Sequence, residues 1–162
     1  MLKPETQRIF WFLGIATAII TVDQVIKAIV VQNLVPEVSY PLIGGLVHLY
    51  LIYNDAAAFS IGFGATYIFT IISSIATLTL LWFGRKMMSV SWALMAGALL
   101  GGVVGNLIDR LIRPPSFGSG YVVDYIQIPL NFPIFNVADM AIFIATSLTV
   151  IRVLSGQQIG RA

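Results

Sequence analysis

Four long apolar stretches constrain this chain more than any other feature of its sequence. They cover residues of about 9–31, 66–83, 91–112 and 134–152. A helix needs roughly 20 mostly apolar residues to cross the hydrocarbon core of a bilayer. Only 10% of the residues are charged, whereas soluble domains have about 25%. The sequence therefore predicts an all-α polytopic membrane protein, with four transmembrane helices in a single membrane domain over residues 1–162.

The basic residues predict how these helices are oriented. Lys and Arg concentrate on the cytoplasmic side of membrane proteins. The connections of about 33–65 and 114–133 contain neither residue, so we expect both of them outside the cell. Both termini are then cytoplasmic, and the first span is expected to be a retained anchor. The basic residues that set this orientation are Lys3, Arg8, Arg85, Lys86, Arg152 and Arg161.

The two outer connections contain sequence that is typical of β-strands. Residues 44–60 begin with two glycines and continue with β-branched and aromatic residues, which predicts one or two short strands. In the second connection, the run 122–126 lies between segments rich in Pro and Gly and predicts another extended piece. A small extracytoplasmic β-strand region is therefore expected beside the helices.

Ionisable residues lie at a common depth near the outer ends of the expected spans. With a rise of about 1.5 Å per residue, Asp23 and Lys27 lie about 21 and 27 Å above the inner end of their span. Asp109 lies about 27 Å above the start of its own span. A charged side chain inside a membrane is costly, and it indicates a functional site by default. The predicted layer contains Asp23, Lys27, Asn54, Asp109, Asp124 and Asp139.

Two of these acids have a cation one helical turn away. Asp23 precedes Lys27 by four residues, and Asp109 precedes Arg113 by four. Pairs at this spacing face each other on a helix. A structural salt bridge explains both pairs at least as well as a catalytic role.

Asp124 and Asp139 lack such a neighbour, because no Lys or Arg occurs between Arg113 and Arg152. Two such carboxyl groups share a proton if they meet in a poorly solvated site. One can then activate water while the other protonates a leaving group. Their separation is not a helical spacing, so the sequence permits this meeting without requiring it. Alternatively, Asn136 caps the fourth helix and Asp139 only stabilises its N-terminus.

Five motifs, taken together, resemble the bacterial lipoprotein signal peptidases, also called type II signal peptidases. The motifs are DQVIK (23–27), NDAAAFS (54–60), GGVVGNLIDR (101–110), VVDY (122–125) and FNVAD (135–139). The resemblance implies an aspartic endopeptidase of the plasma (inner) membrane. Such an enzyme removes the signal peptide from diacylglyceryl-modified prolipoproteins, cutting before the lipidated Cys. It also implies that the outer strands form a cradle-like region around the substrate.

The resemblance assigns roles to individual residues. It implies that Asp124 and Asp139 are catalytic and that the active site lies near the outer face. It implies no cofactor or metal, and inhibition by the cyclic peptide globomycin. One departure is Ala56, where many relatives have Gly, beside the added charge of Asp55. The residues implied to bind substrate or support the site are Asp23, Lys27, Asn54, Asn106, Asp109, Arg110 and Asn136.

Other functional classes fit the sequence less well. Without Cys there is no thiol nucleophile, and a single His excludes an HExxH zinc site. The Gly-x-Gly-Asp motif of presenilin-type proteases is also missing. A small proton-coupled carrier that uses Asp139 as a relay stays open, although carriers usually show repeated halves. A non-catalytic assembly subunit also stays open as an alternative. We expect a monomer whose partners are lipid-modified prolipoprotein and membrane lipid, with no nucleic acid.

Overall fold

The computed structural model describes residues 3–55, 65–87 and 89–159. In these ranges, four helices are long and apolar enough to cross a membrane, and three strands form one antiparallel sheet. The predicted fold class is therefore confirmed. The elements are α1 (Pro4–Asn33), β1 (Ser39–Ile43), β2 (Val47–Asn54), α2 (Ala65–Gly84), α3 (Val90–Ile112), β3 (Val122–Gln127) and α4 (Val137–Leu154).

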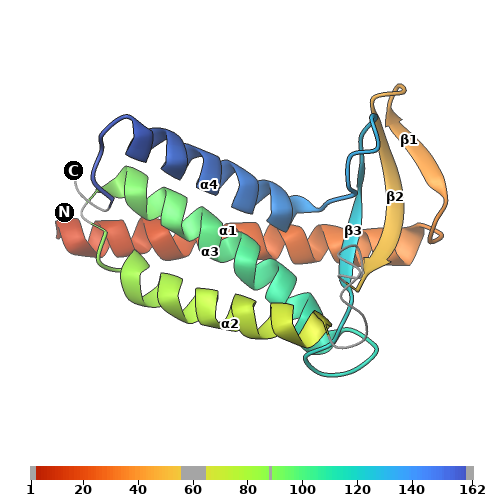
Figure 1. Ribbon diagram of the computed structural model, residues 1–162, viewed down its shortest axis with the longest axis horizontal. Coiled ribbons are helices and arrows are strands. Elements are labelled where there is room, and N and C mark those ends of the chain that lie inside the picture. The colour runs from red at the N-terminus through yellow and green to blue at the C-terminus, as the bar shows by residue number, and fades with distance from the viewer. Residues whose placement is uncertain (1–2, 56–64, 88, 160–162) are drawn as a thin grey trace.

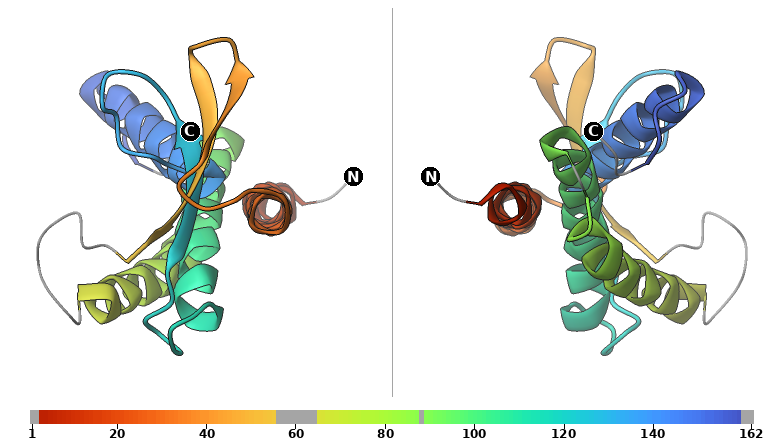
Figure 2. Two further views of the ribbon diagram at one scale, coloured as in Figure 1. Left: turned by 90° about the vertical axis from the view of Figure 1, so that its right-hand side faces the viewer. Right: turned by 90° about the vertical axis from the view of Figure 1, so that its left-hand side faces the viewer.

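Helix α3 lies at the centre of the bundle, in contact with α1, α2 and α4. Its apolar window is 56% buried, whereas those of the other three helices are 11–17% buried. The outer three helices therefore turn most of their apolar surface toward lipid. In Figure 2, α2 and α4 diverge on one side of α3, and α1 lies on the other side.

Glycines on α3 allow the neighbouring helices to approach closely. A Cβ at Gly101 would lie 2.9 Å from the carbonyl oxygen of Ala16 in α1. A Cβ at Gly102 would lie 2.5 Å from the carbonyl oxygen of Ala138 in α4. Small residues at such crossings let helix backbones pack in direct contact. The two glycines thus set how near α1 and α4 come to α3.

The sheet lies at one end of the helix bundle, in the order β1–β2–β3 (Figure 1). A buried apolar cluster fixes it to the end of α1, and this cluster contains Val30, Leu51, Val123 and Tyr125. Strand β2 lies within the segment 44–60 where the sequence pattern predicted strands, and β3 covers the predicted run 122–126 and extends one residue further, to Gln127. Strand β1 was not predicted, because it precedes the two glycines and contains Pro41, which disfavours a strand.

The chain between β3 and α4 folds back on itself. Leu130 and Asn131 have positive φ angles of 73° and 54°, which reverse the chain direction. Phe135 then pairs antiparallel with Ile126. The Ile126 N–H donates to the Phe135 carbonyl at 2.8 Å, and the Phe135 N–H donates back at 3.1 Å. This return brings the start of α4 beside β3, which sequence spacing could not predict.

Candidate active site

Asp124 lies on β3 with its carboxyl group almost completely buried, at 2% exposure. Its two oxygens accept hydrogen bonds from side-chain amides: Asn54 Nδ2 at 2.8 Å and Asn136 Nδ2 at 2.6 Å. Burial raises the pKa of Asp124 to about 7, and the nearby charge of Asp139 adds to the rise. The two amide hydrogen bonds oppose it. The carboxyl group is therefore poised to gain or lose a proton near neutral pH.

Asp139 occupies the third position of α4, where it forms a capping box with Asn136. The Asn136 N–H donates to Asp139 Oδ2 at 3.1 Å, and the Asp139 N–H donates to Asn136 Oδ1 at 2.9 Å. The predicted cap at Asn136 is thus confirmed, and it explains why α4 begins at Val137. Capping uses one carboxylate oxygen, while the other accepts a bond from Asn106 Nδ2 at 2.7 Å.

Asn136 connects the two carboxyl groups. Its Nδ2 donates to Asp124, and its backbone N–H donates to Asp139. The same Nδ2 also lies 3.1 Å from Asn106 Oδ1. Among the described residues, the ion pairs involve neither Asp124 nor Asp139. Amide groups take the place that a cation would occupy, so the structure brings these two acids into one polar cluster without neutralising them.

Lys27 forms the centre of a buried ionic cluster behind this carboxyl pair. Its Nζ lies 2.9 Å from Asp23 Oδ2 and 2.8 Å from Asp109 Oδ2. It also donates to Asn106 Oδ1 at 3.0 Å. An ammonium group has three N–H donors, and these three acceptor oxygens provide one partner for each. The bond to Asn106 Oδ1 turns the amide nitrogen of that residue toward Asp139.

One carboxylate of the cluster holds the backbone of β3. Asp109 Oδ2 accepts the backbone N–H of Val123 at 3.1 Å. Val123 immediately precedes Asp124, so the ion pair with Lys27 fixes the position of that part of the strand. Arg113 reaches the other oxygen of Asp109 with its Nε at 2.7 Å, which confirms the pairing suggested by their spacing.

The other carboxylate of the cluster holds the N-terminus of α4. Asp23 Oδ1 accepts the backbone N–H of Ala138 at 3.0 Å. Ala138 immediately precedes Asp139 in the first turn of the helix. Each carboxylate paired with Lys27 therefore binds the residue just before one member of the Asp124–Asp139 pair.

All of the residues predicted for the site lie in this network. Arg110 is at its edge, where Nη1 donates to the Asn106 carbonyl at 3.3 Å and the guanidinium lies over the Phe69 ring. Sequence reasoning missed Gln24, whose amide donates to Asp23 and Asp109 and to the Gly105 carbonyl. The sequence signal that could have identified Gln24 is its position within the DQVIK motif. In the network are Asp23, Lys27, Asn54, Asn106, Asp109, Arg110, Asp124, Asn136 and Asp139.

The predicted departure at Ala56 lies outside the described residues. Among the described residues, no group of three His, Cys, Asp or Glu side chains is placed to hold a metal ion. His48 lies on β2, and its Nδ1 lies 2.7 Å from Ser39 Oγ at an exposed position.

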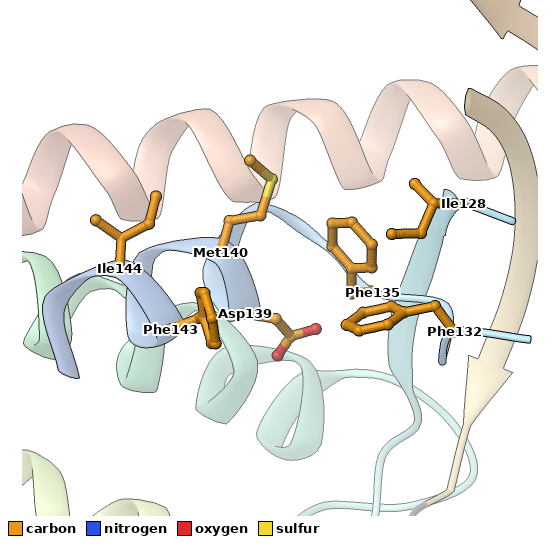
Figure 3. Close-up of a pocket in the computed structure, with 7 residues that line it drawn as sticks. All are labelled: Ile128, Phe132, Phe135, Asp139, Met140, Phe143 and Ile144. Atoms are coloured by element: carbon orange, nitrogen blue, oxygen red, sulfur yellow. The ribbon is translucent and has the colours of Figure 1, made fainter. Parts of the chain in front are cut away.

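An apolar groove of about 410 Å³ runs along α4 beside Asp139 (Figure 3). We call it the α4 groove. Sequence reasoning missed it, because its residues come both from α4 and from the connection of residues 128–136 between β3 and α4, which we call the return loop. It is lined by Ile128, Phe132, Phe135, Asp139, Met140, Phe143 and Ile144.

Comparison with known proteins identifies relatives over most of the chain. The family model described as signal peptidase (SPase) II matches residues 15–155. The lipoprotein signal peptidase of Leifsonia xyli subsp. xyli is 42% identical over 142 residues, which cover 88% of this chain and 66% of that protein. The lipoprotein signal peptidase of Mycobacterium leprae is 38% identical over 156 residues, covering 96% of this chain and 76% of that protein.

Two solved structures share the fold. A bacterial membrane enzyme determined by the in meso method at 1.9 Å resolution has a TM-score of 0.81 and 29% identity, over 90% of this chain and 94% of that chain. Another, at 2.3 Å resolution, has a TM-score of 0.78 and 30% identity, over 89% of this chain and 87% of that chain. The family match, the relatives and the four apolar helices agree, and this multi-pass membrane protein belongs to the signal peptidase II family.

Proposed function

We propose that this chain is an aspartic endopeptidase that cuts diacylglyceryl-modified prolipoproteins just before the lipidated Cys, using water activated by Asp124 and Asp139. As a member of its family, the chain is a membrane protease that cleaves the signal peptides of lipoproteins. One observation carries the catalytic assignment. The buried carboxyl group of Asp124 and the half-buried carboxyl group of Asp139 share Asn136 as a hydrogen-bond partner, and the pKa of Asp124 is raised to about 7.

A pair of carboxyl groups with one proton between them can perform peptide hydrolysis without a covalent intermediate. The ionised carboxylate takes a proton from water while the water oxygen attacks the scissile carbonyl. The protonated carboxyl donates to the carbonyl oxygen, which gives a neutral tetrahedral intermediate. When the C–N bond breaks, the carboxyl group that took the proton from water donates it to the leaving amine. The other carboxylate takes a hydroxyl proton from the intermediate as its C=O bond re-forms, so the pair is again singly protonated. Either aspartate can begin as the base in this scheme.

The surrounding network serves to hold the pair in place. Asn54 and Asn136 keep Asp124 buried and hydrogen-bonded, and Asn106 orients Asp139. The ionic cluster around Lys27 fixes the two backbone segments that carry the acids. Preorganised groups of this kind lower a reaction barrier because little reorganisation is needed during the reaction.

We place the active site at the outer face of the bacterial inner membrane, with both termini in the cytoplasm. The support is the distribution of Lys and Arg, which are missing from both connections at the sheet end of the bundle. A monomer suffices for the site, because one chain supplies every residue of the network. Globomycin is expected to inhibit the reaction.

The test is a cleavage assay with the detergent-purified protein and a diacylglyceryl-modified prolipoprotein. Mass spectrometry should find the released signal peptide and a product that begins with the lipidated Cys. Asp124→Asn and Asp139→Asn should each abolish cleavage, whereas Glu5→Gln, an exposed change in the first turn of α1, should not. Normal cleavage by either Asn variant would remove the carboxyl pair from the mechanism. Proton flux without cleavage would instead favour a carrier.

A further inference from the structure

The α4 groove passes the proposed catalytic site and continues into the membrane-spanning part of the protein. Asp139, in the first turn of α4, lies between Phe132 and Phe135 at one end of the groove and Phe143 and Ile144, which lie one turn further along the helix, at the other end (Figure 3). Phe143 is 73% exposed and Ile144 is 52% exposed. On a helix that spans a membrane, such surfaces face lipid. The groove is therefore open to the bilayer along its length.

We propose that the α4 groove holds a fatty acyl chain of the substrate's diacylglyceryl-cysteine during cleavage. The inference rests on the proposed function and extends it, because it assigns the lipid part of the substrate to particular residues. Met140, Phe143 and Ile144 contact the chain along α4, and Phe132 and Phe135 contact it near the carboxyl pair.

The chemistry of the lining favours an acyl chain over a peptide. Apart from the Asp139 carboxylate, the lining side chains have no hydrogen-bonding groups. An extended signal peptide in this groove would leave its backbone N–H and C=O groups unpaired, which is costly in an apolar environment. A helical signal peptide pairs its own backbone groups, but it is about 10 Å wide, and a single turn fills roughly 420 Å³. The groove of about 410 Å³ would therefore hold about one turn.

The position of the groove favours an acyl chain of the substrate over one of the bulk lipid. In the proposed reaction the scissile bond adjoins the lipidated Cys, so the acyl chains start within one residue of the carboxyl pair. Asp139 belongs both to that pair and to the groove. From there α4 runs along the direction that a chain must take to enter the bilayer. A single path therefore joins the reacting bond to the hydrocarbon core.

The outer end of the groove has a defined shape. The Phe132 and Phe135 rings make an edge-to-face contact, with centroids 5.8 Å apart and planes at 85°. Phe135 is held to Ile126 by the backbone pairing that returns the chain from β3. Lipid tails are as apolar as the groove, so little hydrophobic energy is gained when a chain enters it. The groove acts instead by orienting the Cys relative to the carboxyl pair.

Filling the groove should impair only substrates with long acyl chains. Ile144→Trp places a large ring in the groove, and Leu148→Trp is its matched control, because Leu148 is exposed one turn further along the same helix. Two synthetic prolipoprotein peptides are compared, one with palmitoyl and one with butyryl chains on the glyceryl group. We expect Ile144→Trp to lower kcat/KM for the palmitoyl substrate by about tenfold, since misplacing a substrate by about 1 Å can cost up to roughly 100-fold in rate. The butyryl substrate should be affected less than twofold, and Leu148→Trp should match the wild type with both.

A labelling experiment identifies the occupant independently of turnover. The Asp124→Asn protein is mixed with a substrate that carries a photoreactive diazirine in one palmitoyl chain. We expect crosslinks at Met140, Phe143 or Ile144, and competition by unlabelled palmitoyl substrate. Labelling by a diazirine phospholipid that excess substrate does not displace would assign the groove to bulk lipid. Labelling from a diazirine in the signal peptide would assign it to the peptide. Either result overturns the inference.

The two proposals fail in different ways. If wild-type protein does not cleave either substrate, the proposed function fails. If wild-type protein cleaves both substrates and Ile144→Trp has equal effects on them, the proposed function stands and the acyl assignment is wrong.

Discussion

At the scale of single residues, the charged side chains of the site form two groups with different partners. Lys27 has two carboxylates and one amide oxygen around it, with no exposed side-chain surface. Asp124 and Asp139 receive only neutral amide donors from the described residues around them. The first group is satisfied electrostatically and is suited to a fixed structural role. The second keeps the ability to exchange a proton.

Lys27→Met tests the structural role of the first group. The change leaves two buried carboxylates without their cation, and removing one partner of a buried ion pair costs about 3 to 5 kcal/mol. We expect a loss of unfolding free energy of that size, measured by denaturation in detergent, together with loss of cleavage. Lys86→Met is the control, because Lys86 is exposed beside Trp82. If the two variants proved equally stable, Lys27 would not hold the site together.

At the scale of elements, close packing of α4 on α3 sets the position of Asp139. Apolar length predicted all four helices, and the motifs predicted which polar residues gather at the site. The meeting of Asp124 with Asp139 could not be predicted, because it depends on a turn at Leu130 and Asn131. Leucine rarely adopts a positive φ angle, so nothing in its side chain signals such a turn.

Gly102→Ala tests this packing. The new Cβ would lie 2.5 Å from the Ala138 carbonyl oxygen and 2.7 Å from an Ile142 side-chain carbon, so α4 must shift away from α3. Because a displacement of about 1 Å can cost 100-fold in rate, we expect kcat to fall by at least about tenfold. Gly14→Ala on α1 is the matched control, since its Cβ would have no neighbour within 4 Å. Equal activity of both variants would show that the α3–α4 distance does not position Asp139.

At the scale of the whole molecule, the sheet lies at one end of four membrane-crossing helices (Figure 1). The proposed catalytic residues lie at the same end, because Asp124 is on β3 and Asp139 is in the first turn of α4. The connections at that end lack Lys and Arg, and the short turn at the other end contains Arg85 and Lys86. This distribution predicts that the site end faces out of the cell.

Cysteine labelling tests this orientation without background, because the chain contains no Cys. Leu130→Cys lies in the return loop, where the native side chain is 97% exposed, and Arg85→Cys lies in the opposite turn. A membrane-impermeant maleimide should label the first variant in intact cells. It should label the second only after permeabilisation. The reverse pattern would place the site on the cytoplasmic side.

The proton on Asp124 provides the most direct test of the central claim, which is that the two carboxyl groups hold one proton between them. Infrared spectroscopy of the purified protein can follow the protonated carboxyl absorption that disappears in Asp124→Asn. Below a pH of about 7 the proton should be present, and it should be lost as the pH rises through that value, with cleavage falling in parallel because the acid is lost. Loss of the proton near the ordinary pKa of 3.8 would contradict the account.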